Sequence, residues 1–235
     1  QTLSSTDLIT IPAGAPGTTV GNSSPFPSNI NATGLPALGV QITSVTLNGL
    51  SHTFPGDLDI YLTSPSGQTV MLMSDAGGAT DVVNVDLTFQ DGAPLLTAAA
   101  IVSGTYGPTD ITPGDAGVPA GYSTTLSTFT GNPNGNWGLF IIDDAGGDVG
   151  SLAGWSITFS VPFSATTYTW TASPAGNAVI SNPNIQNPTA TVTGNVTFTV
   201  TANTGTGCNA TGTVSVNPTQ AVTINSISAT PNAIC

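Results

Sequence analysis

The sequence predicts an all-β protein built from two successive β-sandwiches. Thr, Val and Ile, which favour strands, are common beside many Gly, Pro, Asn and Ser, a composition typical of short strands joined by tight turns. Several segments alternate apolar and polar residues with a period of two, as half-buried antiparallel strands do. No amphipathic helix of useful length is present, since the apolar run 95–102 is short and lies between Pro94 and Gly104.

The distribution of charge divides the chain into two modules. No residue after Asp148 carries a formal charge, whereas acidic residues are frequent before it. We therefore predict a first β-sandwich over residues 1–162 and a small immunoglobulin-like sandwich over residues 163–218. Residues 219–235 are interpreted as a linker and the first strand of a further repeat.

Individual strands follow from the alternation. In the first module we predict a closing hairpin over 137–155, with Trp137, Leu139 and Ile141 on one face, and then a strand over 155–161. The second module contains four alternating segments, which are 166–172, 189–194, 196–202 and 211–216.

The two cysteines leave their pairing open. Cys208 lies late in the second module, and the other cysteine, Cys235, is the last residue. Either they pair across the linker, or Cys235 belongs to a following domain. Both readings fit an oxidising compartment, and a chain that begins at Gln1 and not at Met is expected to be processed. We infer export.

The chain contains no Lys or Arg, and all twelve acidic residues are Asp. Apart from His52 and the amino terminus, no group can neutralise a carboxylate, so converging Asp side chains must be solvated, protonated or bound to a cation. Nucleic acids require a cationic surface, and we expect no nucleic-acid partner. No apolar run approaches the length of a membrane span, and we expect no membrane insertion.

Four motifs of the first module occur together in one known family. They are His52 shortly before Gly56-Asp57-Leu58, then Ser64-Pro65-Ser66-Gly67, then Asn136-Trp137-Gly138-Leu139, and finally Gly150 to Trp155 with Leu152 between them. This pattern, over roughly residues 8–161, resembles the P domain (P/Homo B) that follows the catalytic domain of kexin- and furin-like proprotein convertases. The second module resembles the Ig-like or PKD-like repeats of large bacterial adhesins.

The resemblance implies a jelly-roll-like β-sandwich without proteolytic activity. The acidic residue that the family usually carries before the Gly-x-Trp segment is absent, because "FTGNPNGNW" (129–137) is neutral. The only histidine of the chain, His52, lies within the P-domain-like segment, so no Ser/His/Asp catalytic set can be assembled elsewhere in the chain. His52 precedes a Pro-Gly turn, and we expect it to have a structural role. We therefore predict that the chain is not an enzyme.

Calcium is the predicted cofactor. Carboxylates, amide and backbone carbonyls are its ligands, and loops rich in Asp, Asn and Gly supply them, whereas one His and two separated Cys exclude a soft metal. Bacterial P domains often bind calcium, so the resemblance implies the same. The opposing interpretation is that these Asp residues only stabilise turns. The candidate ligands are Asp57 and Asp59 on one strand face, Asp75, then Asp143, Asp144 and Asp148, with Asp81 and Asp86 as weaker candidates.

We expect a non-catalytic, secreted cell-surface protein: the structural or adhesive N-terminal part of a multidomain bacterial adhesin or surface filament. The expected partners are other copies of itself, further domains of the same chain, and a cell-surface glycan or protein. Two alternatives stay open. One is an accessory P domain of a secreted subtilisin-like protease, and the other is a carbohydrate-binding module in which Trp137, Trp155 and Trp170 stack on sugars and do not fill the core.

Overall fold

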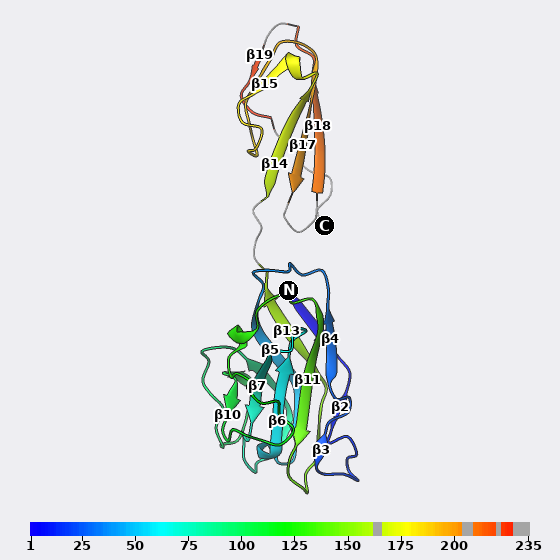
Figure 1. Ribbon diagram of the computed structural model, residues 1–235, viewed down its shortest axis with the longest axis vertical. Helices are drawn as coiled ribbons and strands as arrows, with labels where there is room; N and C mark the ends of the chain where they lie inside the picture. The colour runs from blue at the N-terminus through cyan, green and yellow to red at the C-terminus, as the bar shows by residue number, and fades with distance from the viewer. Residues whose placement is uncertain (162–165, 204–208, 220–221, 228–235) are drawn as a thin grey trace. The chain divides into compact units, whose positions relative to one another are not determined.

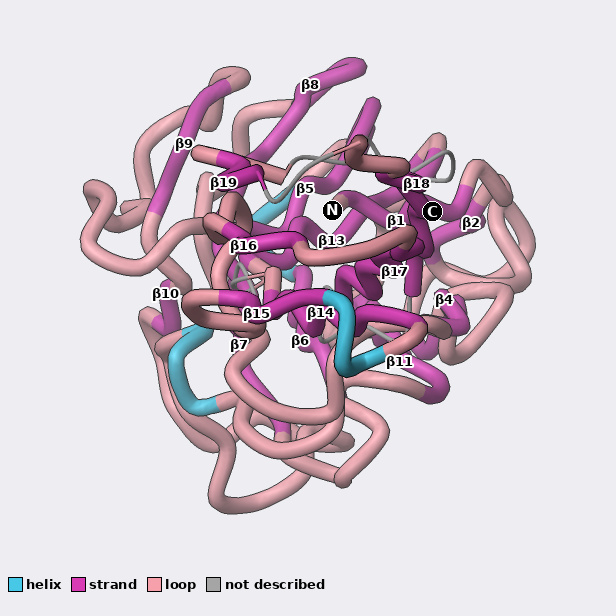
Figure 2. Tube along the Cα trace, turned by 90° about the horizontal axis from the view of Figure 1, so that it is seen from above, coloured by secondary structure: helices cyan, strands magenta, loops and turns pink. Residues whose placement is uncertain are grey.

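The computed structural model describes residues 1–161, 166–203, 209–219 and 222–227 (Figure 1). The chain divides into two compact units, Gln1–Pro162 and Phe163–Cys235. Strands and loops make up almost all of the described chain, as the colours of Figure 2 show. The described helices are short 3-10 turns, and none has the length and apolar character that crossing a membrane requires. They are η1 (Pro55–Asp57), η2 (Leu126–Thr128) and η3 (Ala175–Asn177).

The first unit contains two β-sheets. In one, the order is β1-β13-β5-β12-β2, with β8 pairing with β5 and β9; in the other it is β10-β7-β6-β11-β3, with β4 pairing with β11. Pairing is antiparallel except between β8 and β9 and between β10 and β7. The first sheet comprises β1 (Thr2–Ser5), β2 (Ile9–Ile11), β5 (Gln41–His52), β8 (Val82–Phe89), β9 (Gly104–Tyr106), β12 (Gly150–Leu152) and β13 (Gly154–Ser160); the second comprises β3 (Gly21–Asn22), β4 (Ser28–Ala32), β6 (Leu58–Thr63), β7 (Thr69–Ser74), β10 (Thr109–Asp110) and β11 (Gly135–Asp143).

Apolar side chains of both sheets form one core, which makes the first unit a β-sandwich, as predicted. In β6, Leu58, Ile60 and Leu62 are fully buried in this core, while Asp59 and Tyr61 alternate with them and face away. The predicted inward face of β11 is confirmed in the same way, since Trp137, Leu139 and Ile141 all belong to the core.

The prediction of a hairpin over 137–155 is wrong. β11 lies in one sheet and β12 in the other, so the Asp-rich loop that begins at Asp144 crosses from sheet to sheet. β11 pairs with β6, whereas β12 pairs with β2 and β5. Alternation indicates that each segment is a strand, but it carries no information on which sheet completes it.

The second unit is a small β-sandwich of two three-stranded sheets. Trp170, Val192 and Phe198 lie in its core, and both sheets contribute to it. The sheet orders are β14-β17-β18 and β15-β16-β19. These strands are β14 (Thr167–Ser173), β15 (Ala178–Ile180), β16 (Ala190–Val192), β17 (Val196–Asn203), β18 (Asn209–Val216) and β19 (Val222–Ile224).

The range 219–235, expected to hold a linker and the first strand of a further repeat, is described only in part. In that part, β19 pairs antiparallel with β16 and completes the second unit's own sheet, while residues 228–235 lie outside the described chain. Ile227 is also buried in the core of this unit. Cys208 and Cys235, whose pairing the sequence leaves open, lie outside the described residues.

Candidate metal centre

Three carboxylates meet at one end of the β6–β11 sheet, which Figure 1 shows at the bottom of the first unit, where β6 begins and β11 ends. They belong to Asp59, Asp115 and Asp144, and one oxygen of each lies within 4.8 Å of the other two. Asp59 is in β6, Asp115 is in the loop that follows β10, and Asp144 directly follows β11. The group therefore joins three segments that are far apart in the sequence.

Strand pairing brings these residues together. Asp59 lies opposite Ile142 in the β6–β11 pair, so Asp144 follows two residues beyond that register position. The Asp144 amide donates a hydrogen bond to the Asp57 carbonyl at 3.0 Å, which holds the start of this loop against the start of β6. On the other side, Asp59 lies opposite Ser74 of β7. The Ser74 hydroxyl donates to Asp115 at 3.1 Å.

Asp59 is the buried member of the group. Its side chain is 2% exposed, and its Oδ2 atom has no hydrogen-bond partner among the described residues. The pKa of Asp59 is raised to about 7, first by burial and then by the Asp115 carboxylate, although the Ser74 hydroxyl acts in the opposite direction. The pKa of Asp144 is also raised, first by burial and then by Asp75 and Asp115. Among the described residues, none of these three carboxylates forms an ion pair.

The charges of the three carboxylates disfavour the arrangement unless a cation is present. At a separation of 4.8 Å, two unit charges repel by ~1 kcal/mol if water screens them fully and by ~3 kcal/mol at an effective dielectric constant of about 20. The chain has no Lys or Arg that could offset this repulsion. Its one histidine is used elsewhere, as described below for Asp143.

The dimensions and the donor set fit calcium. Oxygen ligands lie about 2.3–2.6 Å from Ca²⁺, so two of them on opposite sides are separated by about 4.6–5.2 Å. The three oxygens within 4.8 Å of one another can therefore contact one ion. All three donors are hard carboxylate oxygens, which suits calcium and not a soft metal. Asp59, Asp115 and Asp144 are the residues that would hold it, with water completing the six to eight ligands.

The predicted ligands Asp57 and Asp148 do not belong to this group. Asp57 lies in η1 and not on the β6 strand, because the preceding Pro55 and Gly56 form a turn. Burial raises the pKa of Asp57, and Asp148 and then Asp144 raise it further. Asp148 accepts a hydrogen bond from the Thr53 hydroxyl at 2.8 Å.

Asp75 begins the turn after β7. Its φ of 54° is in the left-handed region, which Asp tolerates better than most residues. Its Oδ2 accepts a hydrogen bond from the Ser74 hydroxyl at 3.3 Å, the same hydroxyl that donates to Asp115. Asp75 therefore contributes negative charge beside the group through a shared partner.

Asp143 and Asp144 point in different directions, as expected for neighbours on a strand. Asp143 is fully buried, and its Oδ2 lies 3.3 Å from Nε2 of His52. The pKa of Asp143 is raised to about 6, because the effect of burial exceeds the opposite effect of the His52 charge. Nδ1 of His52 accepts a hydrogen bond from the Phe54 amide at 3.2 Å. This pair joins the end of β5 to the end of β11, which is a structural role.

The two weaker candidates lie on the other sheet. Asp86 is in β8, and its Oδ1 accepts a hydrogen bond from the Gly49 amide at 2.8 Å. Asp81 is exposed just before β8. Neither belongs to the three-carboxylate group found in the described part of the chain.

Asp115 was not among the predicted ligands, although the sequence contains a signal for it. The tripeptide Asp-Ala-Gly occurs at 75–77, 115–117 and 144–146, and of its three aspartates Asp75 and Asp144 are predicted ligands. The structure brings Asp115 and Asp144 of these repeats against Asp59, with Asp75 beside them. Asp115 lies in a loop without strand alternation, so no face could be assigned to it.

The tryptophans do not form a sugar-stacking surface. Trp137, Trp155 and Trp170 are 3%, 0% and 3% exposed. Each indole N–H donates within the protein: to the Pro133 carbonyl at 2.8 Å, to the Ser28 hydroxyl at 2.9 Å and to the Ile185 carbonyl at 3.0 Å, respectively. These contacts place all three in cores.

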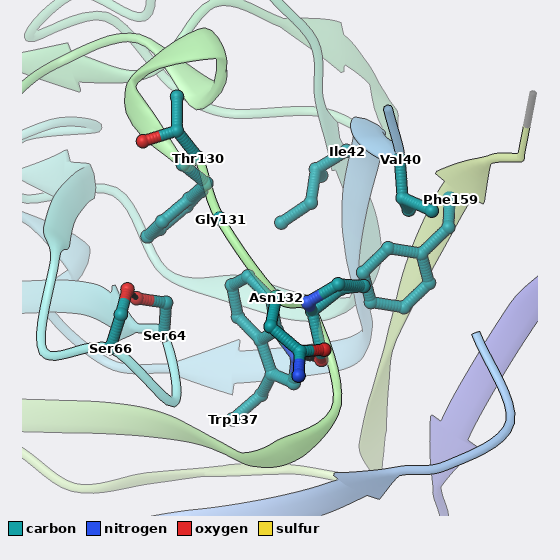
Figure 3. A pocket seen from close by; sticks show the side chains of 11 residues that line it. Val40, Ile42, Ser64, Ser66, Thr130, Gly131, Asn132, Trp137 and Phe159 are labelled. Atoms are coloured by element: carbon teal, nitrogen blue, oxygen red, sulfur yellow. Dashed lines mark hydrogen bonds between the residues drawn. The ribbon is translucent and has the colours of Figure 1, made fainter. Parts of the chain in front are cut away.

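Figure 3 shows a small pocket at the other end of the sandwich, with Ile42, Trp137 and Phe159 around it. Its volume is about 10 Å³, which is room for about one water molecule. The hydroxyls of Ser64 and Ser66 at its rim are hydrogen-bonded to each other at 2.9 Å. The pocket therefore offers no site for a larger ligand.

In the metal-free chain, the free energy of unfolding is expected to fall as the pH rises from about 4 to about 7. Asp59 keeps its proton in the folded state up to a pKa of about 7, but ionises near 3.8 once unfolded. Between these values the folded state binds more protons, so a rise in pH favours unfolding. Asp143, with its pKa raised to about 6, adds an effect of the same sign.

Thermal melts in EGTA at about pH 5 and about pH 7.5 test this pH dependence. The Asp59→Asn variant should show a weaker dependence, because it lacks the carboxyl with the higher folded-state pKa. Equal stability of the metal-free wild type at the two pH values would contradict the prediction.

The family model described as the proprotein convertase P-domain matches residues 40–159. The matched segment runs from the residue before β5 to the penultimate residue of β13, and it contains Asp59, Asp115 and Asp144. A search of curated proteins found no match to this chain.

Proposed function

The chain belongs to the proprotein convertase P-domain family, and on that premise we propose that it is a non-catalytic, calcium-binding β-sandwich module of a secreted protein. P domains are found in proprotein convertases and subtilisin-like proteases, occur in secreted proteins, and are non-catalytic in general. The one histidine of this chain is buried against Asp143, which supports a role without acid–base catalysis.

One observation carries the calcium proposal: a buried carboxylate that has an oxygen without a partner lies close to two further carboxylates. Oδ2 of Asp59 has no hydrogen-bond partner in the described structure, and Asp115 and Asp144 each place an oxygen within 4.8 Å of the other ligand atoms. An isolated buried charge is strongly disfavoured unless it is paired, protonated or bound to a metal. Calcium would supply the missing positive charge and bind segments from three parts of the first unit.

We propose a structural or adhesive role in a multidomain surface protein. The succession of two β-sandwich units along one chain supports it, since surface proteins are commonly built from several small domains in one polypeptide. The chain has no Lys or Arg, and its charged side chains are the carboxylates of the first unit. It therefore offers no cationic surface to which an acidic partner could bind. Electron microscopy of purified chain tests filament formation, and binding to cells or a glycan array tests adhesion.

The family match favours a second role, as the accessory module of a secreted subtilisin-like protease. If this is correct, the purified chain should raise the melting temperature of such a protease when the two are mixed or fused. The surface-protein role predicts no effect on the protease. Sequencing the gene on both sides of the segment that encodes this chain also separates the two roles. A neighbouring subtilisin-like domain would favour the protease role, and a run of Ig-like repeats would favour the surface-protein role.

Calcium titration by calorimetry tests the proposed module directly. We expect wild-type chain to bind one Ca²⁺ and Asp59→Asn to bind it at least about tenfold more weakly, because ligand charge sets the affinity of calcium sites. Asp81→Asn is the matched control, since it removes the same charge from an exposed position on the other sheet. An absence of calcium binding by the folded wild type, or equal weakening in both variants, would overturn the proposal.

A further inference from the structure

The outer face of the β6–β11 sheet carries a second apolar cluster that a loop partly covers. Tyr61, Met71 and Ile142 are buried there, although they point away from the main core. The ring of Tyr61 stacks on Phe140 with centroids 4.7 Å apart and planes at 7°. The partly buried residues that pack on this cluster are Phe26, Phe140, Val118 and Tyr122. The last two belong to the loop 111–122, which also contains Asp115.

The loop 111–122 contains no strand, and backbone hydrogen bonds hold it at its two ends. The Ile111 amide donates to the Ser74 carbonyl at 3.4 Å, and Ser123, just beyond the loop, exchanges hydrogen bonds with Thr69 and Met71. Between these points, side chains connect the loop to its surroundings. The Tyr61 hydroxyl donates to the Gly117 carbonyl at 3.4 Å, and the Tyr122 hydroxyl donates to Asp110 at 2.5 Å.

Asp115 is the position at which this loop reaches the candidate metal centre. The other two carboxylates of the group, Asp59 and Asp144, are attached to the paired strands β6 and β11. A cation shared by the three would therefore fasten the loop to the sheet. Without a cation, the same three carboxylates repel each other when they are ionised. At the Asp115 side chain, the hydrogen bond from the Ser74 hydroxyl opposes that repulsion.

We infer that calcium fastens the loop 111–122 over the outer cluster and that its removal releases the loop and uncovers Tyr61 and Phe140. This inference rests on the proposed calcium site and adds its consequence for the surface of the protein. The main core contains no residue of the loop, so release of the loop leaves the sandwich folded. Calcium concentration would then control the exposure of an aromatic surface.

Hydrogen exchange measured by mass spectrometry on the whole chain tests the inference. In EGTA, amides of residues 112–122 should exchange at least about tenfold faster than in saturating calcium, because local opening is no longer opposed by the ion. Amides of β11 and β13 should stay protected in both conditions. Binding of a hydrophobic dye should rise in EGTA together with the loop exchange.

Asp115→Asn separates the fastening of the loop from the binding of the ion. In saturating calcium, this variant should exchange its loop amides faster than wild type, because a neutral amide holds the shared ion more weakly than a carboxylate, while Asp59 and Asp144 still bind the ion with reduced affinity. Asp81→Asn, which leaves the group intact, should behave as wild type. If Asp115→Asn does not fold, the comparison of wild type with and without calcium still decides the matter.

The outcomes are distinguishable from those of the proposed function. If calorimetry detects no calcium binding, the proposed site itself fails. If calcium binds but the loop exchanges equally with and without it, the inference of a fastened loop is overturned and the calcium site stands. Equal acceleration of the β11 and β13 amides in EGTA would also overturn the inference, because it would show global and not local opening.

Discussion

Removal of calcium is expected to lower the melting temperature of the first unit by about 5–10 °C. A ligand held at about 100 times its Kd stabilises the folded state by about 2.7 kcal/mol, and each kcal/mol corresponds to about 2–4 °C in a domain of this size. The physical cause would be the loss of the divalent cation that we propose is bound by Asp59, Asp115 and Asp144. Calorimetric scans in saturating calcium and in excess EGTA measure the difference.

Two variants make this experiment specific. Asp59→Asn should reduce the effect of calcium to about half or less, the result of an affinity at least about tenfold lower. Its metal-free form should melt above metal-free wild type, because one buried member of a repelling group is gone. Asp81→Asn should keep the full calcium effect, since Asp81 is exposed and lies on the other sheet. An unchanged melting curve of wild type in EGTA would rule out stabilisation by calcium.

Trp155→Ala is expected to destabilise the first unit by about 3–5 kcal/mol, the usual cost of removing a large aromatic side chain from a core. Trp155 is fully buried, and its indole N–H donates to the Ser28 hydroxyl at 2.9 Å. The substitution therefore leaves a cavity and also removes the partner of a buried polar group. Urea unfolding followed by near-ultraviolet circular dichroism measures the change in midpoint.

A surface variant of the same unit provides the control. Val83 is an apolar residue of β8 that is 75% exposed, so Val83→Ala should change the free energy of unfolding by less than about 0.5 kcal/mol. The slope of the unfolding transition should stay the same in both variants if the unfolded state is unaffected. A cost below about 1 kcal/mol for Trp155→Ala would show that this residue is not part of a rigid core.

Much of the fold could be predicted from the sequence, because the patterns that indicate strands are local. Alternation over a few residues identifies a strand and its inward face, and it correctly placed Trp137, Leu139 and Ile141 on one face. The strand Val222–Ile224 shows the limit of such patterns, since alternation indicates a strand but not its partner. That partner, β16, lies about thirty residues earlier in the chain.

The residues of the candidate site could be predicted from the sequence only in part. Asp59 and Asp144 were predicted because they stand beside apolar strands, whereas Asp57, placed by its alternation on the face of Asp59, lies in a turn before the strand. Asp115 was missed because its loop has no periodic pattern. A loop position acquires a neighbour only when the chain folds back over the sheet, which no local signal reveals.

The sequence by itself determined that this chain forms β-sandwiches and that its carboxylates have no Lys or Arg to pair with, because periodicity is local and composition is independent of fold. Only the tertiary structure decided which carboxylates meet. Asp143 turns inward to His52, while Asp144, its neighbour, joins Asp59 and Asp115. The physical reason is that convergence depends on strand register and on the path of the loop 111–122, both of which arise from long-range packing.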